Sequence, residues 1–254
     1  MKDSFKSTIY YILGVILLIV LFQILSMAIN DNVVVPSIGM IVKSFFSLLG
    51  DSKTYIYIGY SLLDLFIAIV VATSIGILLG TITGLRPEIY KVFKPLMSFF
   101  RILPVIVLIL MVMLYSNLDY VASIVSSLVL IPIIYEGTYQ GIIKVDKDIT
   151  NAYRLDTKFN FRVLTKIYLP LISSTLRTAL ITALGVGIKV VITAEYICGS
   201  NNSLGRAIIN ALAQAEYSLL YSYSIVLIIL ILGIEFLPKL TRLGYDKLKK
   251  LISK

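Results

Sequence analysis

Residues 61–84 read SLLDLFIAIVVATSIGILLGTITG, an apolar run in which Asp64 is the only charged residue. As an α-helix this run is long enough to cross the hydrocarbon of a bilayer, which takes about 20 residues. Small side chains recur at every fourth position and form one smooth face along the helix: Ala68, Ala72, Gly76, Gly80 and Gly84. In lipid such a face lets another backbone approach closely, and we expect it to pack within the chain.

Other apolar runs predict five more spans, at residues 9–29, 96–115, 120–135, 171–197 and 219–237. The first run follows two lysines as a signal peptide would. It is too long for one and no cleavage site follows, so we expect a retained helix. Residues 37–60 are only partly apolar and are expected to lie at the outer interface. Pro104 and Pro132 fall inside the third and fourth spans and should kink them.

Basic residues predict the orientation of these spans. If both termini are cytoplasmic, 19 of the 23 Lys and Arg residues lie inside. The exceptions are Lys43, Lys53 and Arg206, which fall outside, and Lys189, which lies within a span. This strong positive-inside bias predicts an all-α, multi-pass membrane protein with six spans and both termini in the cytoplasm.

The composition excludes several other classes of protein. Of the 254 residues, 58% are hydrophobic and 15% charged. A soluble domain carries about 25% charged residues. There is no His and a single Cys, Cys198, so a His/Cys metal site, a Ser–His or Cys–His pair and an internal disulfide are not expected. The net charge of +9 lies at membrane edges, which argues against nucleic acid as a partner. We expect no catalytic residue, metal or cofactor.

The fifth predicted span repeats the small-residue face with Ala179, Ala183 and Gly187. Polar groups follow it, so we expect this face near a subunit axis or a pore. Lys189 and Glu195 come next on the same span, with Lys189 about 10 Å below the outer boundary. The candidate residues for a substrate path are Ala183, Gly187, Lys189 and Glu195.

Lys189 has three interpretations, because a charge inside a span is costly unless it faces water, pairs or reaches the headgroups. It could line a water-filled path, where it would attract anionic ligands. It could form an ion pair with Asp64 or Glu195. It could also extend to the headgroups. The sequence leaves these open.

A polar loop joins the fourth and fifth spans, and its second part, residues 144–170, reads KVDKDITNAYRLDTKFNFRVLTKIYLP. Asp146 or Asp148 can cap a short helix that ends near Leu155. Residues 161–168 form a second short amphipathic piece. We therefore expect a two-helix element that protrudes into the cytoplasm.

The end of this loop resembles the cytoplasmic signature of the inner-membrane permeases of binding-protein-dependent ABC importers. That signature is Glu-Ala-Ala, three residues, Gly, nine residues, then Ile-x-Leu-Pro. Ile167, Leu169 and Pro170 match its end. The spacing is kept further back, but the Glu and the Gly are lost, since the corresponding residues are Asn151, Ala152, Tyr153 and Thr157.

Further segments resemble the same family, in its order, over residues 55–245. They are Ser61-Leu62-Leu63, Gly84-Leu85-Arg86, Pro95-Leu96, Phe100-Arg101-Ile102-Leu103-Pro104, Ala194-Glu195, Gly199-Ser200 and Leu204-Gly205. The resemblance is closest to the nitrate, sulfonate and taurine subgroup, which also contains permeases for thiamine precursors.

The resemblance implies a homodimer in the bacterial inner membrane, two cytoplasmic ATPase subunits and an extracytoplasmic binding protein that delivers a small ligand, anionic or similar to a vitamin precursor. The chain has no G-x-x-x-x-G-K-[ST] phosphate loop, so it should not hydrolyse ATP. Residues 1–54 would be an N-terminal helix and interfacial segment, 55–245 the permease domain and 246–254 a basic tail. Coupling to the ATPase would involve Asn151, Ala152, Tyr153, Leu155, Thr157, Ile167, Leu169 and Pro170.

Two other classes compete with this interpretation. A self-contained secondary transporter or channel would be favoured by an inverted repeat, and none is evident between residues 1–115 and 116–254. A membrane-embedded enzyme is disfavoured by the absence of His and of a clustered acid pair.

Overall fold

The computed structural model describes residues 2–29, 31, 34–146 and 160–252, and these contain helices and no strand. The expected all-α polytopic membrane protein is confirmed. In chain order the helices are α1 (Lys2–Ile29), α2 (Ile38–Gly50), α3 (Ser52–Leu85), α4 (Pro87–Ile102), α5 (Val105–Met113), α6 (Leu118–Ile143), α8 (Phe161–Val163), the π-helix η1 (Leu164–Tyr168), α9 (Leu169–Leu171), α10 (Ser173–Cys198), α11 (Leu204–Ala213) and α12 (Tyr217–Ile252).

Four helical segments of the described chain are long and apolar enough to cross a membrane, where the sequence predicted six spans. They are α3, α6, α10 and the Tyr217–Ile234 part of α12. The third predicted span is broken, because α4 and α5 meet at an angle of 94° and would count as a fifth span only as a bent pair. Pro104 lies at this break and has no N–H to donate to a helix. The described apolar part of the first span, Leu13–Ile29, falls among the shorter helices.

The chain divides into two compact units. The first comprises residues 1–55 and 207–229. In it, Ser26 Oγ donates to Val35 O at 3.0 Å and Ser222 Oγ donates to Ile41 O at 3.1 Å. The first bond joins α1 to the segment before α2, and the second joins α12 to α2. With 13 residues α2 is too short to cross a bilayer. It covers the first half of the predicted interfacial segment, while α3 begins at Ser52 rather than at the expected Ser61.

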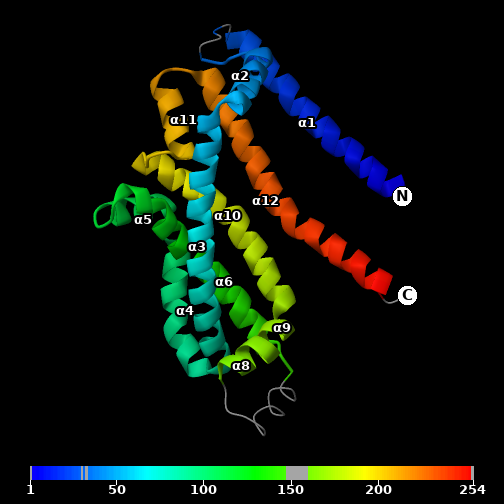
Figure 1. The fold of residues 1–254 in the computed structure, drawn as a ribbon, viewed down its shortest axis with the longest axis vertical. Helices are drawn as coiled ribbons and strands as arrows, with labels where there is room; N and C mark the ends of the chain where they lie inside the picture. Colours follow the sequence, from blue (N-terminus) through cyan, green and yellow to red (C-terminus); the bar gives the residue numbers. More distant parts are fainter. Residues whose placement is uncertain (1, 30, 32–33, 147–159, 253–254) are drawn as a thin grey trace. The chain divides into compact units, whose positions relative to one another are not determined.

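The second unit comprises residues 56–206 and 230–254 and is organised around α6. Helices α4, α5 and α10 all contact α6, and Figure 1 shows α3 running beside them. No residue of α6 between Val125 and Ile142 is exposed. Most of its residues there are apolar, as expected of a helix that its neighbours cover.

The small-residue face of α3 packs on α6, as predicted. A Cβ on Gly80 would lie 2.7 Å from Thr138 Cβ and 2.8 Å from Tyr135 O, and one on Gly76 would lie 2.9 Å from Ile134 Cβ. The two backbones approach this closely only because these positions carry no side chain.

The small-residue face of α10 packs in the same way, which corrects the expectation that it lies near a subunit axis or a pore. Ala183 is fully buried in a cluster with α3 and α6 residues that includes Ala68 and Leu130. A Cβ on Gly187 would lie 2.8 Å from Leu65 Cδ1. This face is therefore occupied by the chain itself.

The second piece of the cytoplasmic loop is helical, as predicted. Tyr168 is buried against Val163, Ile142 and Ile172 at the end of α6. The N–H of Leu169 donates to the carbonyl of Leu164, five residues back, which gives one π-helical turn. Residues 147–159 lie outside the described part of the chain. They include five of the predicted coupling residues: Asn151, Ala152, Tyr153, Leu155 and Thr157.

Candidate functional site: a polar face on α10

Every exposed residue of α10 is polar, although this helix is long and apolar enough to span a membrane. The exposed residues are Ser173, Ser174, Arg177, Thr178, Thr182, Lys189 and Thr193. Five of them recur at spacings of four or seven residues and form one stripe along the helix: Ser174, Thr178, Thr182, Lys189 and Thr193. We call this stripe the polar face of α10. An apolar environment would favour large hydrophobic side chains at these positions.

The threonines of the polar face satisfy their hydroxyl protons within the helix. Thr178 and Thr182 each donate to the carbonyl four residues back at 3.0 Å, and Thr193 donates to Lys189 O at 2.7 Å. Such bonds let Thr lie in a membrane helix at low cost. The hydroxyl oxygens keep lone pairs that can accept hydrogen bonds from water or from a ligand.

The polar face continues into a cleft between α4, α6 and α10 with a volume of about 620 Å³. Thr178 and Thr182 line it from α10, Glu136 and Gln140 from α6, and Arg101 from α4. This volume lies within the range of small-molecule sites, about 300–1,000 Å³.

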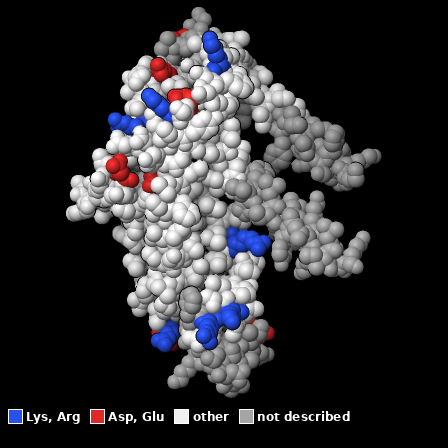
Figure 2. Space-filling view, in the orientation of Figure 1, with Lys and Arg blue, Asp and Glu red and all other residues white. Residues whose placement is uncertain are grey.

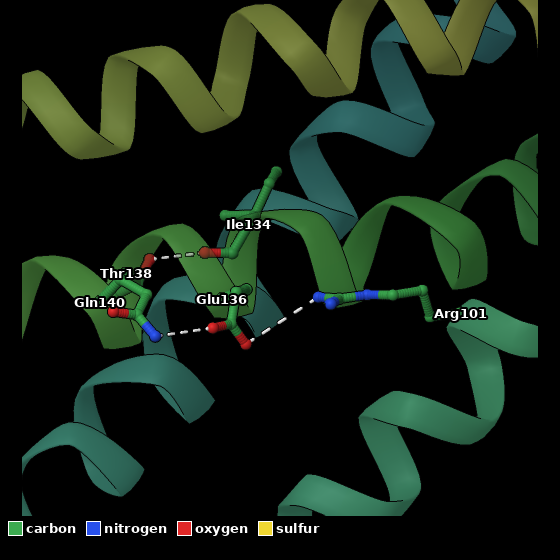
Figure 3. Close-up of polar contacts among 5 residues, drawn as sticks. All are labelled: Arg101, Ile134, Glu136, Thr138 and Gln140. Carbon is green, nitrogen blue, oxygen red and sulfur yellow. Dashed lines mark hydrogen bonds and ion pairs between the residues drawn. The ribbon is translucent and has the colours of Figure 1, made fainter.

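Figure 3 shows how the charged groups of the cleft face one another. Glu136 extends from α6 toward Arg101 on α4, with 3.9 Å between Oε2 and the guanidinium Nη2. The other carboxylate oxygen of Glu136 accepts a hydrogen bond from Gln140 Nε2 at 2.9 Å. This is the only ion pair within the described part of the chain.

Aromatic packing holds α4 against α6 beside this cleft. The rings of Tyr90 and Tyr139 stack with centroids 4.1 Å apart, and Lys94 Nζ lies 5.8 Å from the Tyr90 ring centroid. A stacked pair of this kind contributes about 0.5–1.5 kcal/mol beyond its buried area. The two helices that carry Arg101 and Glu136 are therefore packed against each other.

Lys189 is exposed on the polar face and forms no ion pair with a described side chain. Asp64 accepts a hydrogen bond from Ser123 instead. The ion-pair interpretation of Lys189 is therefore wrong in this structure, for Asp64 and equally for Glu195. A water-filled path and extension to the headgroups remain.

Glu195 is fully buried and lies away from the polar face, where it caps the first turn of α11. Its Oε2 accepts hydrogen bonds from Ser61 Oγ at 2.8 Å and from Gly205 N at 3.0 Å. A carboxylate there offsets the positive end of the helix dipole. The predicted path residues Ala183, Gly187 and Glu195 are thus buried packing or capping groups, and only Lys189 is exposed.

The same geometry explains three sequence segments that carried the family resemblance. A Cβ on Gly205 would lie 2.4 Å from Tyr196 N, so only Gly fits beside α10. Gly199 has φ +61°, a conformation that L side chains rarely adopt, and ends α10. Ala194-Glu195, Gly199-Ser200 and Leu204-Gly205 therefore build the turn between α10 and α11.

Sequence reasoning missed the polar face and the cleft. The four-residue spacing of Ser174, Thr178 and Thr182 was the available signal for the face. No sequence spacing predicts the Arg101–Glu136 pair, because the two residues lie on different helices. Among the described residues, no group of His, Cys, Asp or Glu could hold a metal ion.

The fold and the polar face together define a polytopic membrane protein in which one spanning helix has a polar surface. The family model for the "Binding-protein-dependent transport system inner membrane component" matches residues 72–240. The chain belongs to this family, the inner-membrane permeases of ABC importers. This membership favours the importer interpretation over a self-contained secondary transporter or channel.

Two solved structures have a similar fold, both described as inward-facing conformations of the MetNI methionine ABC transporter. One crystal form gives a TM-score of 0.60 and the other 0.59. Each is 16% identical in sequence, and the match covers 73% of this chain and 90% of the other. The comparison with functionally curated proteins gave no match.

Proposed function

We propose that this permease forms the substrate path of its importer along the polar face of α10. The observation that supports this most directly is the exposure of polar side chains alone on α10. Water in a path solvates hydroxyls and charges that lipid would exclude. The ligand is a small molecule delivered by an extracytoplasmic binding protein, and the exposed cation Lys189 on the polar face favours an anionic one.

The path lies between two copies of the chain in this proposal, each contributing its polar face. Exposed α10 residues of the two copies would then face one another. Thr193→Cys in a Cys198→Ser background should therefore cross-link between subunits, whereas the buried Ala183→Cys should not. Cross-linking at Ala183 alone would place the dimer axis elsewhere.

Residues 146–168 would couple the permease to two cytoplasmic ATPase subunits. They lie in the permease domain, residues 55–245, between the N-terminal segment 1–54 and the basic tail 246–254. Ile167, Leu169 and Pro170 supply the family spacing, and the packing of Tyr168 on α6 gives the loop a stiff base. A rigid base is what a docked element needs to transmit a rigid-body motion. The bias of basic residues supports a cytoplasmic location for this end and for both termini.

The path is tested by scanning cysteines with water-soluble thiol reagents. Single cysteines at Thr178, Thr182 and Thr193 should react, while one at Val70, on the apolar exposed surface of α3, should not. Cys198 is buried and is the only native cysteine, so Cys198→Ser gives a clean background. Equal and negligible reaction at all four positions would refute a water-lined face.

Coupling is tested by co-purification with an ATPase subunit. Breaking the first predicted loop helix with Ala152→Pro should abolish stimulated ATPase activity while the chain still inserts. Unchanged stimulation in this variant would rule out docking through residues 146–168.

A further inference from the structure

The cleft between α4, α6 and α10 holds a charged group whose hydrogen-bonding capacity is unused. Arg101 has five N–H donors. The nearest carboxylate oxygen, on Glu136, lies 3.9 Å away, beyond hydrogen-bond distance, and no described residue accepts a hydrogen bond from the guanidinium. Its side chain is 56% exposed. An aqueous oxyanion could therefore reach this fork of donors.

From this geometry we infer that Arg101 is an anion-binding group on the transport path and that the cleft is a site for the anionic oxyacid group of the ligand. A guanidinium binds carboxylate, sulfonate or phosphate through two parallel hydrogen bonds. A single long contact with Glu136 gives neither that geometry nor that strength. This inference rests on the proposed path, because it assumes that ligands reach the cleft through water.

Glu136 lies beside Arg101 without accepting a hydrogen bond from it. Gln140, one turn along α6, fixes the Glu136 carboxylate through its other oxygen at 2.9 Å. Exposed ion pairs contribute about 0–1 kcal/mol, so a bidentate ligand anion can displace this one. Glu136 is the only acidic residue that lines the cleft, and Arg177 lies exposed on α10 beside Thr178.

The side chains that line the cleft from α10 indicate which other groups the ligand carries. The protons of Thr178 and Thr182 are already donated to helix carbonyls, so these hydroxyls present acceptors to the cleft. Glu136 is an acceptor as well when ionised. The site therefore suits a small molecule that carries one oxyanion and, a few bonds away, hydrogen-bond donors such as an amine or hydroxyl.

The charge preference of the cleft can be measured without knowing the ligand. Thr178→Cys in the Cys198→Ser background reports on the cleft, and Thr193→Cys is the matched position on the same face outside it. The two probes are the anionic reagent sulfonatoethyl methanethiosulfonate and the cationic reagent trimethylammonioethyl methanethiosulfonate. The measured quantity is the ratio of their rate constants, anionic over cationic, for the assembled complex in phosphatidylcholine nanodiscs.

Arg101→Gln should lower this ratio at Thr178→Cys by about tenfold, from the loss of one nearby charge, and leave it unchanged at Thr193→Cys. Glu136→Gln should raise it at Thr178→Cys. If neither substitution changes the ratio at Thr178→Cys, Arg101 is not the anion-binding group of the cleft. Equal rates for both reagents would overturn only the anion site, whereas no reaction at either position would refute the proposed path itself.

Protection by sulfate tests the donor fork, because Arg101→Lys keeps the charge and loses bidentate geometry. Sulfate should slow labelling of Thr178→Cys relative to chloride at equal ionic strength, and Arg101→Lys should weaken that protection. Since this variant retains the cation, it also covers the case in which Arg101→Gln fails to fold. A lipid headgroup presents the same oxyanion chemistry. Protection by phosphatidylglycerol in the nanodisc, with none by sulfate, would assign the cleft to lipid and overturn the ligand site.

Discussion

Helices α3 and α10 are alike where they face the chain and opposite where they face outward. Both use small residues at every fourth position to pack closely, α3 on α6 and α10 on α3 and α6. Their outward surfaces differ. Between residues 60 and 78, α3 exposes Tyr60, Leu63, Phe66, Ile67, Val70, Val71, Ser74, Ile75 and Leu78, whereas α10 exposes no large hydrophobic residue.

The difference indicates which surface is suited to contact with lipid. Ser74 is the single hydroxyl in that α3 set, apart from the tyrosine, and it donates to Val70 O at 2.8 Å, so lipid meets no free donor there. Figure 2 shows the corresponding broad white band between charged residues at its two ends. A polar stripe with a lysine belongs in water or against another subunit. The outward-facing side chains, and not the small residues at every fourth position, therefore distinguish a surface suited to lipid from the proposed path.

The largest loss of stability is expected where the small-residue faces of α3 and α10 pack most tightly. Gly80→Val should destabilise the protein by about 3 kcal/mol, because its new atoms would meet the backbone oxygen of Tyr135. Gly59→Val is the matched control on the same helix, since nothing lies within 4 Å of a Cβ there. Thermal unfolding of the detergent-solubilised protein measures both, and similar midpoints would contradict the packing of α3 on α6.

Gly187→Val on α10 should cost less than Gly80→Val. Its nearest neighbours are the ends of the Leu65 and Leu130 side chains, which can shift, whereas the neighbours of Gly80 include backbone. The order of the two unfolding midpoints tests whether the inner faces of α3 and α10 are equally rigid.

A lysine placed on each outward face tests the comparison directly. Val70→Lys puts a charge on the lipid face near the middle of α3 and should reduce folded yield, at a cost of about 2.5–3.5 kcal/mol. Thr182→Lys puts the same charge on the polar face and should be tolerated. Equal losses in both variants, measured as monodisperse protein after extraction, would mean that lipid covers the two faces alike.

The sequence predicted the packing of α3 better than that of α10, for a physical reason. Residues 61–84 are apolar enough to indicate a span, and a small-residue face within a span indicates close packing. The pattern carries no information on whether the packing partner is the same chain or another one. That is why Ala183 and Gly187 were assigned to a path and lie instead in the core.

The angle at Pro104 and the role of Glu195 could not be predicted from the sequence, because both depend on how the helices and turns are arranged in three dimensions. The break at Pro104 was expected as a kink, but its angle of 94° depends on how α4 and α5 pack on α6. Glu195 was recognised as a charge within a span. Its role required the turn that returns Gly205 to the side of α10.

The next effect concerns the junction where α3 and α10 meet. Glu195→Ala leaves two buried donors, Gly205 N and Ser61 Oγ, without their acceptor and should destabilise the protein by about 1–3 kcal/mol. Glu195→Gln keeps an acceptor oxygen and should cost less. If the two variants unfold at the same temperature, the hydrogen bonds at Glu195 do not stabilise this junction.

The smallest effect on stability is expected for Lys189, the one predicted path residue on the outward face. Lys189→Met removes an exposed charge without an ion pair, so unfolding should hardly change. Adding Asp64→Leu should not rescue any loss of function, because Asp64 bonds to Ser123 and the two substitutions are independent.

The two remaining interpretations of Lys189 differ in what a neighbouring cysteine would sense. If Lys189 lines the path, its charge attracts anions toward Thr193, one turn along the same face. Lys189→Met should then lower the ratio of anionic to cationic labelling at Thr193→Cys severalfold, by roughly the energy of one charge at this distance in partly hydrated protein. If the side chain extends to the headgroups, the charge lies outside the path and the ratio should stay constant.

Thr178→Cys is the control position for this substitution. Lys189→Met should leave the labelling ratio there unchanged on either interpretation, because 11 residues of helix separate Thr178 from Lys189, about 16 Å at 1.5 Å per residue. That is beyond the screening length of roughly 10 Å at moderate salt, so a change at Thr193→Cys alone would assign Lys189 to the path.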